Sequence, residues 1–324
     1  MAEPTLNNPP TLHETLRAAC RSSMRKGSLS FFLASRLAGA RLRQGLMVLY
    51  SWCRYCDDAV DAGDQTELVE RRSLAVDELR RETWAAMHGN LVTTPAAGAP
   101  FAMVAFHWLA QCYRIPDHYP QELLAGMDMD VAGQLYRTYD DLRLYCYRVA
   151  GVVGLMFSHL AGVSDEAALK HAADLGAAMQ LTNIARDVLT DVALGRVYLP
   201  HDWLAAEGLS PEDVGDPTKR DAVARVVARL LAAADDYYAS GEAGLRYLPL
   251  RAALAAGAAR FIYAEIGQLV RDRGAAAWES RAVVPLGRKL VLVAKAVRVV
   301  IAQRWSQIGR TWQPAPIRTV WRFS

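Results

Sequence analysis

Two stretches of the 324-residue chain carry polar side chains that would line up on one face of a helix. The first is YSWCRYCDDAVD, residues 50–61, and its polar residues at i, i+4, i+7 and i+11 form what we call the first ladder: Tyr50, Arg54, Asp57 and Asp61. The second is QLTNIARDVLTD, residues 180–191, and its residues at i, i+3, i+7 and i+11 form the second ladder: Gln180, Asn183, Asp187 and Asp191. Residues at these spacings share a helical face. The sequence therefore predicts two helices with stacked carboxylates.

The chemistry of the ladders is that of oxygen ligands held close together. Carboxylates one turn apart have Cβ atoms ~5–6 Å apart, and at an effective dielectric of ~20 their repulsion costs roughly 3 kcal/mol per pair. A hard divalent cation offsets this repulsion, because Mg²⁺ accepts one or two carboxylates and completes its octahedron with water and phosphate oxygens. Arg54 and Arg186 stand beside the acidic residues and offer paired N–H donors for phosphate. The pattern favours a diphosphate-metal site.

The helices that must position these ladders are indicated by their apolar residues. Such residues fill most of the remaining circumference of both segments: Leu49, Trp52, Cys53, Val60, Leu181, Ile184, Val188 and Leu189. Both helices are therefore expected to be largely buried, with the carboxylates lining an internal cavity. We predict the first helix over residues 41–60 and the second over residues 176–192, with Gly195 marking its end.

The composition favours an all-α protein. Hydrophobic residues make up 52% and charged residues 22% of the chain, which is ordinary for a globular protein. Alanine is abundant, and long strand-like alternations of Val, Ile and Thr are missing. Because ligands near residues 57 and 187 must converge, we predict one helical domain over residues 11–305. Residues 1–10 are expected to form a disordered arm, and residues 306–324 a basic, aromatic tail.

The charge distribution bears on possible partners. A net charge of +3 is too small to indicate nucleic acid binding. After Glu279, however, the chain has no acidic residue and carries Arg281, Arg288, Lys289, Lys295, Arg298, Arg304, Arg310, Arg318 and Arg322. Such a segment, which also holds tryptophans, suits an anionic membrane surface. The alternative is a last helix that packs on the bundle, followed by a solvated tail.

Cysteine usage and hydropathy indicate the compartment. The chain has 5 cysteines, an odd number that favours a reducing cytosol. No N-terminal run is apolar enough for a signal peptide, and no segment is expected to span a bilayer. We therefore expect a cytoplasmic protein whose membrane contact, at the inner face of the membrane, is peripheral.

These motifs resemble those of the squalene/phytoene synthase family of head-to-head prenyl synthases, and within it most closely the bacterial phytoene-forming members. The two ladders match the family's aspartate-rich motifs, and the GRVYLP that follows belongs to the second one. Two further elements also match, YCYRVAGVVG at residues 145–154 and GSLSFF at residues 27–32. The similarity extends from about residue 20 to about residue 275. One departure is Thr190, where the second motif usually has an acidic residue.

The resemblance implies an isoprenoid-synthase-type bundle with a central cavity. It also implies a Mg²⁺- or Mn²⁺-dependent prenyltransferase that joins two geranylgeranyl diphosphates through prephytoene diphosphate to phytoene, the first committed step of carotenoid biosynthesis. The implied metal ligands are Asp57, Asp61, Asn183, Asp187 and Asp191. The implied contacts to diphosphate are Ser28, Ser30, Tyr50, Arg54, Gln180 and Arg186. Tyr145 and Tyr263 are expected near the allylic cation.

Three alternatives remain open. A squalene or dehydrosqualene synthase would use farnesyl diphosphate; squalene formation needs NADPH, which we do not expect because no G-x-G-x-x-G follows a strand-like segment. A di-iron oxidase needs two Glu-x-x-His motifs, and no histidine of the chain has that spacing. A degenerate relative that serves as a membrane assembly factor would have lost ladder carboxylates, which are present here. The sequence does not predict the oligomeric state.

Overall fold

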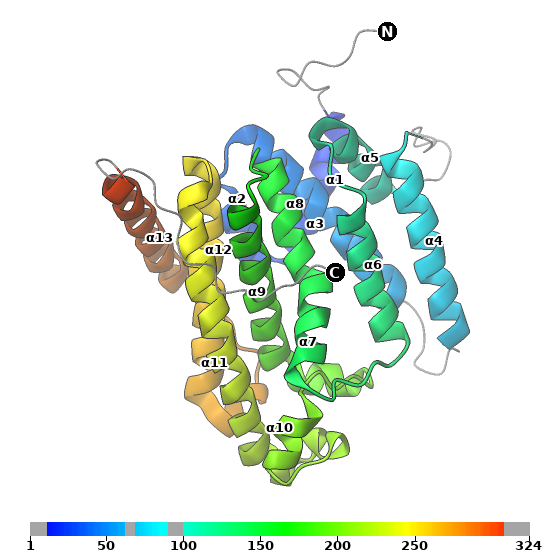
Figure 1. The fold of residues 1–324 in the computed structure, drawn as a ribbon, viewed down its shortest axis with the longest axis vertical. Coiled ribbons are helices and arrows are strands. Elements are labelled where there is room, and N and C mark those ends of the chain that lie inside the picture. Colours follow the sequence, from blue (N-terminus) through cyan, green and yellow to red (C-terminus); the bar gives the residue numbers. More distant parts are fainter. Residues whose placement is uncertain (1–11, 62–68, 90–99, 308–324) are drawn as a thin grey trace. The chain divides into compact units, whose positions relative to one another are not determined.

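The computed structural model describes residues 12–61, 69–89 and 100–307, and these ranges contain helices and no β-strand (Figure 1). The chain divides into two compact units, Met1–Ala132 and Gly133–Ser324. The predicted all-α class is confirmed. The predicted arm lies outside the described residues, as does most of the predicted tail, and the boundaries drawn at residues 10 and 305 stay a prediction.

The first unit is built around one long helix, α3. Its described helices are α1 (Glu14–Gly27), α2 (Leu29–Ser35), α3 (Ala40–Asp61), α4 (Val69–Met87), α5 (Phe101–Tyr113) and α6 (His118–Val131). Helix α3 contacts α1, α4, α5 and α6. Its Trp52 is fully buried, stacks on Phe106 at 4.3 Å between ring centroids, and donates to Thr83 Oγ1 at 3.3 Å. The predicted helix over residues 41–60 is confirmed, with one more residue at each end.

The second unit is built around α9. Its α-helices are α7 (Tyr139–Cys146), α8 (Val152–Leu160), α9 (Glu166–Ala193), α10 (His201–Ala206), α11 (Arg220–Gly244), α12 (Leu250–Arg273) and α13 (Leu286–Gln307). A π-helical turn, η2 (Tyr147–Gly151), joins α7 to α8, and short 3₁₀ turns are η3 (Pro211–Gly215), η4 (Pro217–Lys219), η5 (Leu245–Tyr247) and η6 (Gly274–Trp278). Helix α9 contacts α7, η2, α8, α11 and α12.

Helix α9 is longer than the sequence predicted. It begins at Glu166 rather than Gly176, because Asp165 caps it by accepting a hydrogen bond from the Ala168 N–H at 3.1 Å. It ends at Ala193, and Gly195 follows with φ of 71°. The prediction missed the first turns because their Ala, Leu and Lys residues carry no ladder side chain.

Small residues let α9 approach its neighbours closely. A Cβ atom added to Gly154 would lie 2.1 Å from the Ala172 carbonyl oxygen, and one added to Gly176 would lie 2.2 Å from that of Ala150. These glycines therefore serve backbone contacts between α9 and the η2–α8 segment.

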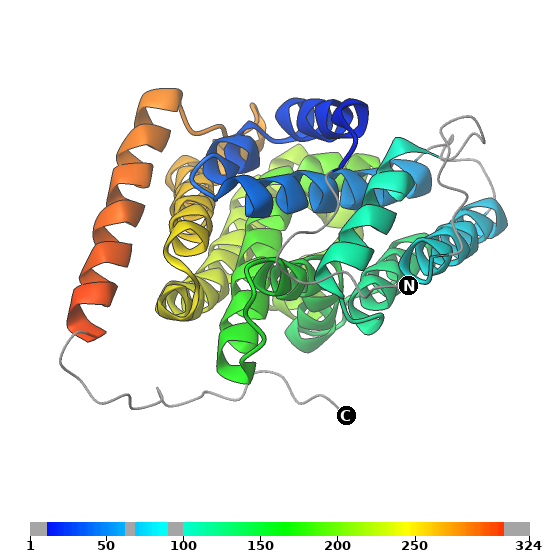
Figure 2. The same ribbon diagram turned by 90° about the horizontal axis from the view of Figure 1, so that it is seen from above.

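Helix α13 stands at the edge of its unit beside α12 (Figure 2). Among the described helices, none combines the length and the apolar character that crossing a membrane requires.

Candidate functional site

The first ladder lies on the side of α3 that faces away from the core. Val48, Trp52, Cys56 and Val60 form the buried stripe of the helix, whereas Arg54, Asp57 and Asp61 are exposed. The predicted alignment on one helical face is therefore confirmed. These three residues have surface accessible to water, and their expected position along a cavity stays a prediction.

The carboxylates of this ladder destabilise one another. Limited hydration beside the surrounding protein raises the pKa of Asp57 to about 7; the charges of Asp61, Asp130 and Asp58 raise it further, and that of Arg54 opposes them. Water that reaches the exposed carboxylate screens part of this effect. The arrangement gains from a bound cation, because a positive charge removes the repulsion.

The donor set fits Mg²⁺ or Mn²⁺. Over the described ranges, no three or more His, Cys, Asp or Glu side chains gather as a ready-made metal cage. An incomplete set of carboxylate oxygens is nevertheless the environment in which Mg²⁺ keeps waters and takes further ligands from substrate phosphates. Asp57 and Asp61 are thus suited to a metal that arrives with a diphosphate.

Asp130 is a further carboxylate close to the first ladder. Asp128 and Asp130, at i and i+2 on α6, have different partners: Asp128 pairs with Arg80 of α4 at 2.6 Å, whereas the charge of Asp130 raises the pKa of Asp57 of α3. Because α6 contacts α3, Asp130 adds a carboxylate to the neighbourhood of the first ladder. Helical spacing within α6 gave no signal for this, since the decisive contact is between helices.

The other first-unit residues of the predicted site lie near Tyr50. The Tyr50 hydroxyl packs against Gly27, where an added Cβ atom would lie 2.1 Å from it. Burial raises the pKa of Tyr50 above its usual value, although the nearby Arg54 guanidinium opposes this shift. Arg54 Nη2 is paired with Asp58 Oδ1 at 2.7 Å. Tyr50 and Arg54 are thus neighbours, and Gly27 brings the GSLSFF segment beside them.

The two serines of that segment have different surroundings. Ser28 is the N-cap of α2, and its Oγ accepts a hydrogen bond from the Phe31 N–H at 3.3 Å. Ser30 lies half-buried in the first turn of this short helix. The Phe31 ring lies 6.3 Å from that of Tyr50, between centroids. Ser28 therefore has a structural role in addition to the predicted contact with substrate.

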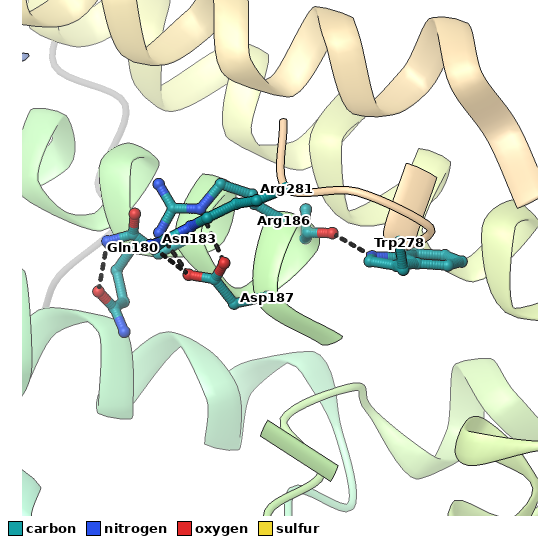
Figure 3. A network of polar contacts seen from close by, with 7 residues as sticks. Gln180, Asn183, Arg186, Asp187, Trp278 and Arg281 are labelled. Atoms are coloured by element: carbon teal, nitrogen blue, oxygen red, sulfur yellow. Dashed lines mark hydrogen bonds and ion pairs between the residues drawn. The ribbon is translucent and has the colours of Figure 1, made fainter. Parts of the chain in front are cut away.

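The second ladder holds a connected set of polar side chains on α9 (Figure 3). Asn183 Nδ2 donates to Gln180 Oε1 at 3.2 Å. Arg186 Nε donates to Asp187 Oδ1 at 2.9 Å, and its Nη2 is paired with Asp187 Oδ2. The side chain of Asp187 is only 20% exposed. The carboxylate is thus sheltered and already balanced by a guanidinium.

A second guanidinium comes from a distant part of the chain. Arg281, which follows η6, places its Nη2 3.3 Å from Asp187 Oδ2 (Figure 3). Burial lowers the pKa of Arg186, but the hydrogen bonds and the charge of Asp187 outweigh it, so that this pKa is raised overall. The neighbouring Tyr263 also raises the pKa of Arg186. The two guanidinium groups beside Asp187 offer N–H donors of the kind that suit a diphosphate.

Helix α9 is irregular where this network sits. Asp187 has φ of −104° and ψ of 16°, outside the helical region, and it interrupts the helix. Two residues earlier, the Ala185 carbonyl accepts a hydrogen bond at 3.0 Å from the indole N–H of Trp278 (Figure 3). Such breaks arise where a side chain engages the backbone of a helix. The carboxylate therefore projects from a bend rather than from a regular turn.

Asp191 and Tyr145 have surroundings of their own. Asp191 lines a small pocket with Arg196 and Tyr198. The buried Tyr145 donates its hydroxyl to that of Tyr198 at 3.1 Å, and the two rings stack at 4.9 Å. Tyr136 joins them at 5.5 Å from both rings. An aromatic wall therefore borders the end of α9 that carries Asp191.

Comparison with known proteins agrees with these motifs. A family model described as squalene/phytoene synthase matches residues 24–288. The phytoene synthase of Pseudescherichia vulneris is 40% identical over 310 residues, which cover 94% of this chain and 96% of that protein. The 15-cis-phytoene synthase of Enterobacter agglomerans is 41% identical over 286 residues, covering 87% of this chain and 95% of its own.

The chain belongs to the squalene/phytoene synthase family.

A solved structure of similar architecture is that of a dehydrosqualene synthase in complex with a ligand. Its TM-score is 0.77 at 25% identity, with 89% of this chain and 98% of that chain covered. The fold expected for a squalene/phytoene synthase is therefore confirmed. The roles assigned to individual ladder residues stay predictions. Arg281 joins them as a candidate found only in the structure. Tyr198 and Asp130 join them because of their interactions with Tyr145 and Asp57.

Proposed function

We propose that this chain is a prenyltransferase that condenses two geranylgeranyl diphosphates head to head, through prephytoene diphosphate, to phytoene. The observation that carries this proposal is its 40% identity, over 94% of the chain, to a protein named phytoene synthase. Both ladders, with their guanidinium neighbours, supply the polar groups that the departure of diphosphate needs.

The reaction begins when the C1–O bond of one substrate breaks and its electron pair leaves with diphosphate. The double bond of the second substrate attacks the allylic cation, and loss of a proton closes the cyclopropane of prephytoene diphosphate. A second ionisation, rearrangement and loss of a proton give phytoene, so two diphosphates are released for each hydrocarbon formed. Both ionisations need the negative charge of the leaving group to be stabilised.

Residues of both ladders are proposed to meet that need. Asp57, Asp61, Asn183, Asp187 and Asp191 would hold Mg²⁺ or Mn²⁺, which when bound supplies electrostatic stabilisation of the leaving group. Arg54, Arg186 and Arg281 donate N–H groups to diphosphate oxygens. Gln180, Tyr50, Ser28 and Ser30 orient the diphosphate.

The aromatic residues are proposed to act on the hydrocarbon part. The faces of Tyr145 and Tyr263 stabilise positive charge on the allylic carbon. The hydrogen bond from Tyr145 to Tyr198 fixes the orientation of the Tyr145 ring. Apolar side chains around them keep water from the cation.

A second candidate is dehydrosqualene formation from farnesyl diphosphate, which the likeness to the solved dehydrosqualene synthase favours. Incubation with each diphosphate separately, with Mg²⁺ and without NADPH, discriminates the two. The proposed function predicts phytoene from geranylgeranyl diphosphate at a higher kcat/KM than any product from farnesyl diphosphate. The opposite preference would assign the shorter substrate.

We also propose that the enzyme works in the cytoplasm with peripheral contact to the inner face of the membrane. Its five cysteines are free thiols, as expected in a reducing compartment. A hydrocarbon product partitions from water into the apolar core of the bilayer.

A further inference from the structure

Helix α13 presents two apolar faces, of which only one is covered. The inward face, packed against α12, contains Lys289, Leu292, Ala296 and Val300, all buried. These positions follow i, i+3, i+7 and i+11, so they lie along one side of the helix. An ordinary surface helix would carry polar residues on the opposite side.

The opposite side of α13 carries large apolar side chains instead. We call it the outer face; its exposed fractions are 58% for Leu286, 63% for Leu290, 56% for Val291, 45% for Ile301 and 72% for Trp305. An exposed apolar face of this kind marks a surface that binds a partner. It runs almost the whole length of a 22-residue helix, which is about 33 Å at the rise of an α-helix.

The charged residues of α13 itself are all cations. Arg298 is exposed in its middle, Lys295 lies at its border over the Phe261 ring, and Arg288 pairs with Glu265 of α12 at 2.6 Å. No acidic residue occurs in the chain after Glu279. A partner of this face must therefore accept apolar side chains and bear negative charge.

We propose that the outer face of α13 is a docking surface for an anionic lipid bilayer. A helix with exposed apolar residues, interspersed cations and a tryptophan near one end lies in the membrane interface with its apolar side immersed. Anionic headgroups neutralise Arg298 and Lys295. This deepens the proposed function, since it names the surface that makes the peripheral membrane contact.

Charge disfavours the other occupants of this face. In a twofold-symmetric pairing of two copies, the cations of one outer face would meet those of the other. The chain's own residues 308–324 contain Arg310, Arg318 and Arg322 and no acidic residue, so they offer no charge complementary to the cations of the outer face. An acidic protein is the remaining alternative, and failure of the wild type to bind anionic vesicles would favour it.

The test is flotation of the full-length protein with phosphatidylcholine vesicles, with and without phosphatidylglycerol. A triple variant, Leu290→Ser, Ile301→Ser and Trp305→Ser, removes the apolar side chains. The matched control, Leu74→Ser, Leu135→Ser and Trp84→Ser, replaces side chains that are 66%, 57% and 48% exposed elsewhere. Wild type and control are expected to bind the anionic vesicles, and the triple variant to bind at least about tenfold more weakly. Arg298→Glu is expected to weaken binding to the anionic vesicles. The remaining binding should change less with salt concentration than that of the wild type.

Several results would overturn the proposal. These are failure of wild type to bind anionic vesicles, equal binding to both kinds of vesicle, or equal losses in the triple variant and the control. A dimer in size-exclusion chromatography that the triple variant dissolves would assign the face to a second copy. Turnover of detergent-dispersed geranylgeranyl diphosphate, expected to be unchanged in the triple variant, reports separately on the proposed function.

Discussion

Asp57 is a residue whose surroundings favour a bound cation. Its carboxylate lies on α3 among Asp58, Asp61 and Asp130, and it is harder to ionise than an ordinary aspartate. Nothing in the packing of α3 requires an acid there, since the core uses the other side of the helix. A residue that costs stability and supports no contact of the core is best explained by function.

We expect Asp57→Asn to lower kcat by about a hundredfold or more, as for other losses of a preorganised electrostatic group. Asp58→Asn is the matched control, because Asp58 is adjacent, exposed and paired with Arg54. That surface pair contributes at most about 1 kcal/mol, so the control should lose less than about fivefold. Steady-state kinetics measure both, and equal losses would contradict the assignment. The melting temperature of Asp57→Asn in EDTA should not fall below that of wild type, because the substitution removes repulsion.

Arg281 pairs with Asp187 and is proposed to donate to the diphosphate. Replacing it with Gln leaves Asp187 with Arg186 but removes a donor for diphosphate. We expect kcat/KM to fall about tenfold, the equivalent of one charge-assisted hydrogen bond of roughly 1.5 kcal/mol. Arg273→Gln, which removes an exposed guanidinium bonded to the Ser280 carbonyl, should leave kcat/KM within twofold. An unchanged kcat/KM in Arg281→Gln would show that the ion pair is structural only.

At the scale of the element, the bend of α9 is the feature that decides where Asp187 points. Trp278→Phe keeps an aromatic ring but deletes the N–H that bonds to the Ala185 carbonyl. We expect a loss of about 1 kcal/mol of stability together with a fall in kcat, because the bend two residues later is no longer fixed. Trp203→Phe, in a ring stack on Tyr139, should lose stability but keep kcat. Denaturant titration and kinetics separate the two effects, and a Trp278→Phe enzyme with normal kcat would refute the positioning role.

The contact between α9 and the η2–α8 segment makes a second prediction at this scale. Gly176→Ala forces a methyl group onto the Ala150 carbonyl, and overpacking of this kind destabilises by about 1–3 kcal/mol. Gly287→Ala on α13 meets no atom within 4 Å, so it should leave the melting temperature unchanged or raise it. Equal melting temperatures of the two variants would show that the close approach of α9 to the η2–α8 segment does not contribute to stability.

The elements also show what the sequence could and could not predict. Helix α3 was predicted almost to its ends because Tyr50, Arg54, Asp57 and Asp61 repeat with the period of a helix and apolar residues fill the rest of its circumference. Asp130 and Arg281 were not found as site residues, because each acts on an aspartate of another element and no local spacing encodes that contact. The bend at Asp187 was likewise hidden, since a run without Gly or Pro predicts a regular helix. Tyr198 was seen in the sequence, but its hydrogen bond to Tyr145 required the fold.

At the scale of the whole molecule, the two ladders belong to different compact units. In the proposed reaction both ladders serve the same diphosphate groups. Each Mg²⁺ or Mn²⁺ ion would take one or two carboxylates from the ladders and complete its coordination with diphosphate and water oxygens. Binding of a ligand stabilises whatever part of the protein its contacts involve. Stabilisation by metal and diphosphate therefore reports whether the ladders act together.

We expect Mg²⁺ with inorganic diphosphate to raise the melting temperature of the wild type and EDTA to abolish both this shift and activity. Asp57→Asn in the first unit and Asp187→Asn in the second should each remove most of the shift. Because each then destroys the same site, the double variant should lose little more than either single one, the non-additivity expected of coupled positions. Differential scanning fluorimetry of the four proteins measures the cycle. Additive partial losses would mean that each ladder binds its own ion, and the joint site would have to be abandoned.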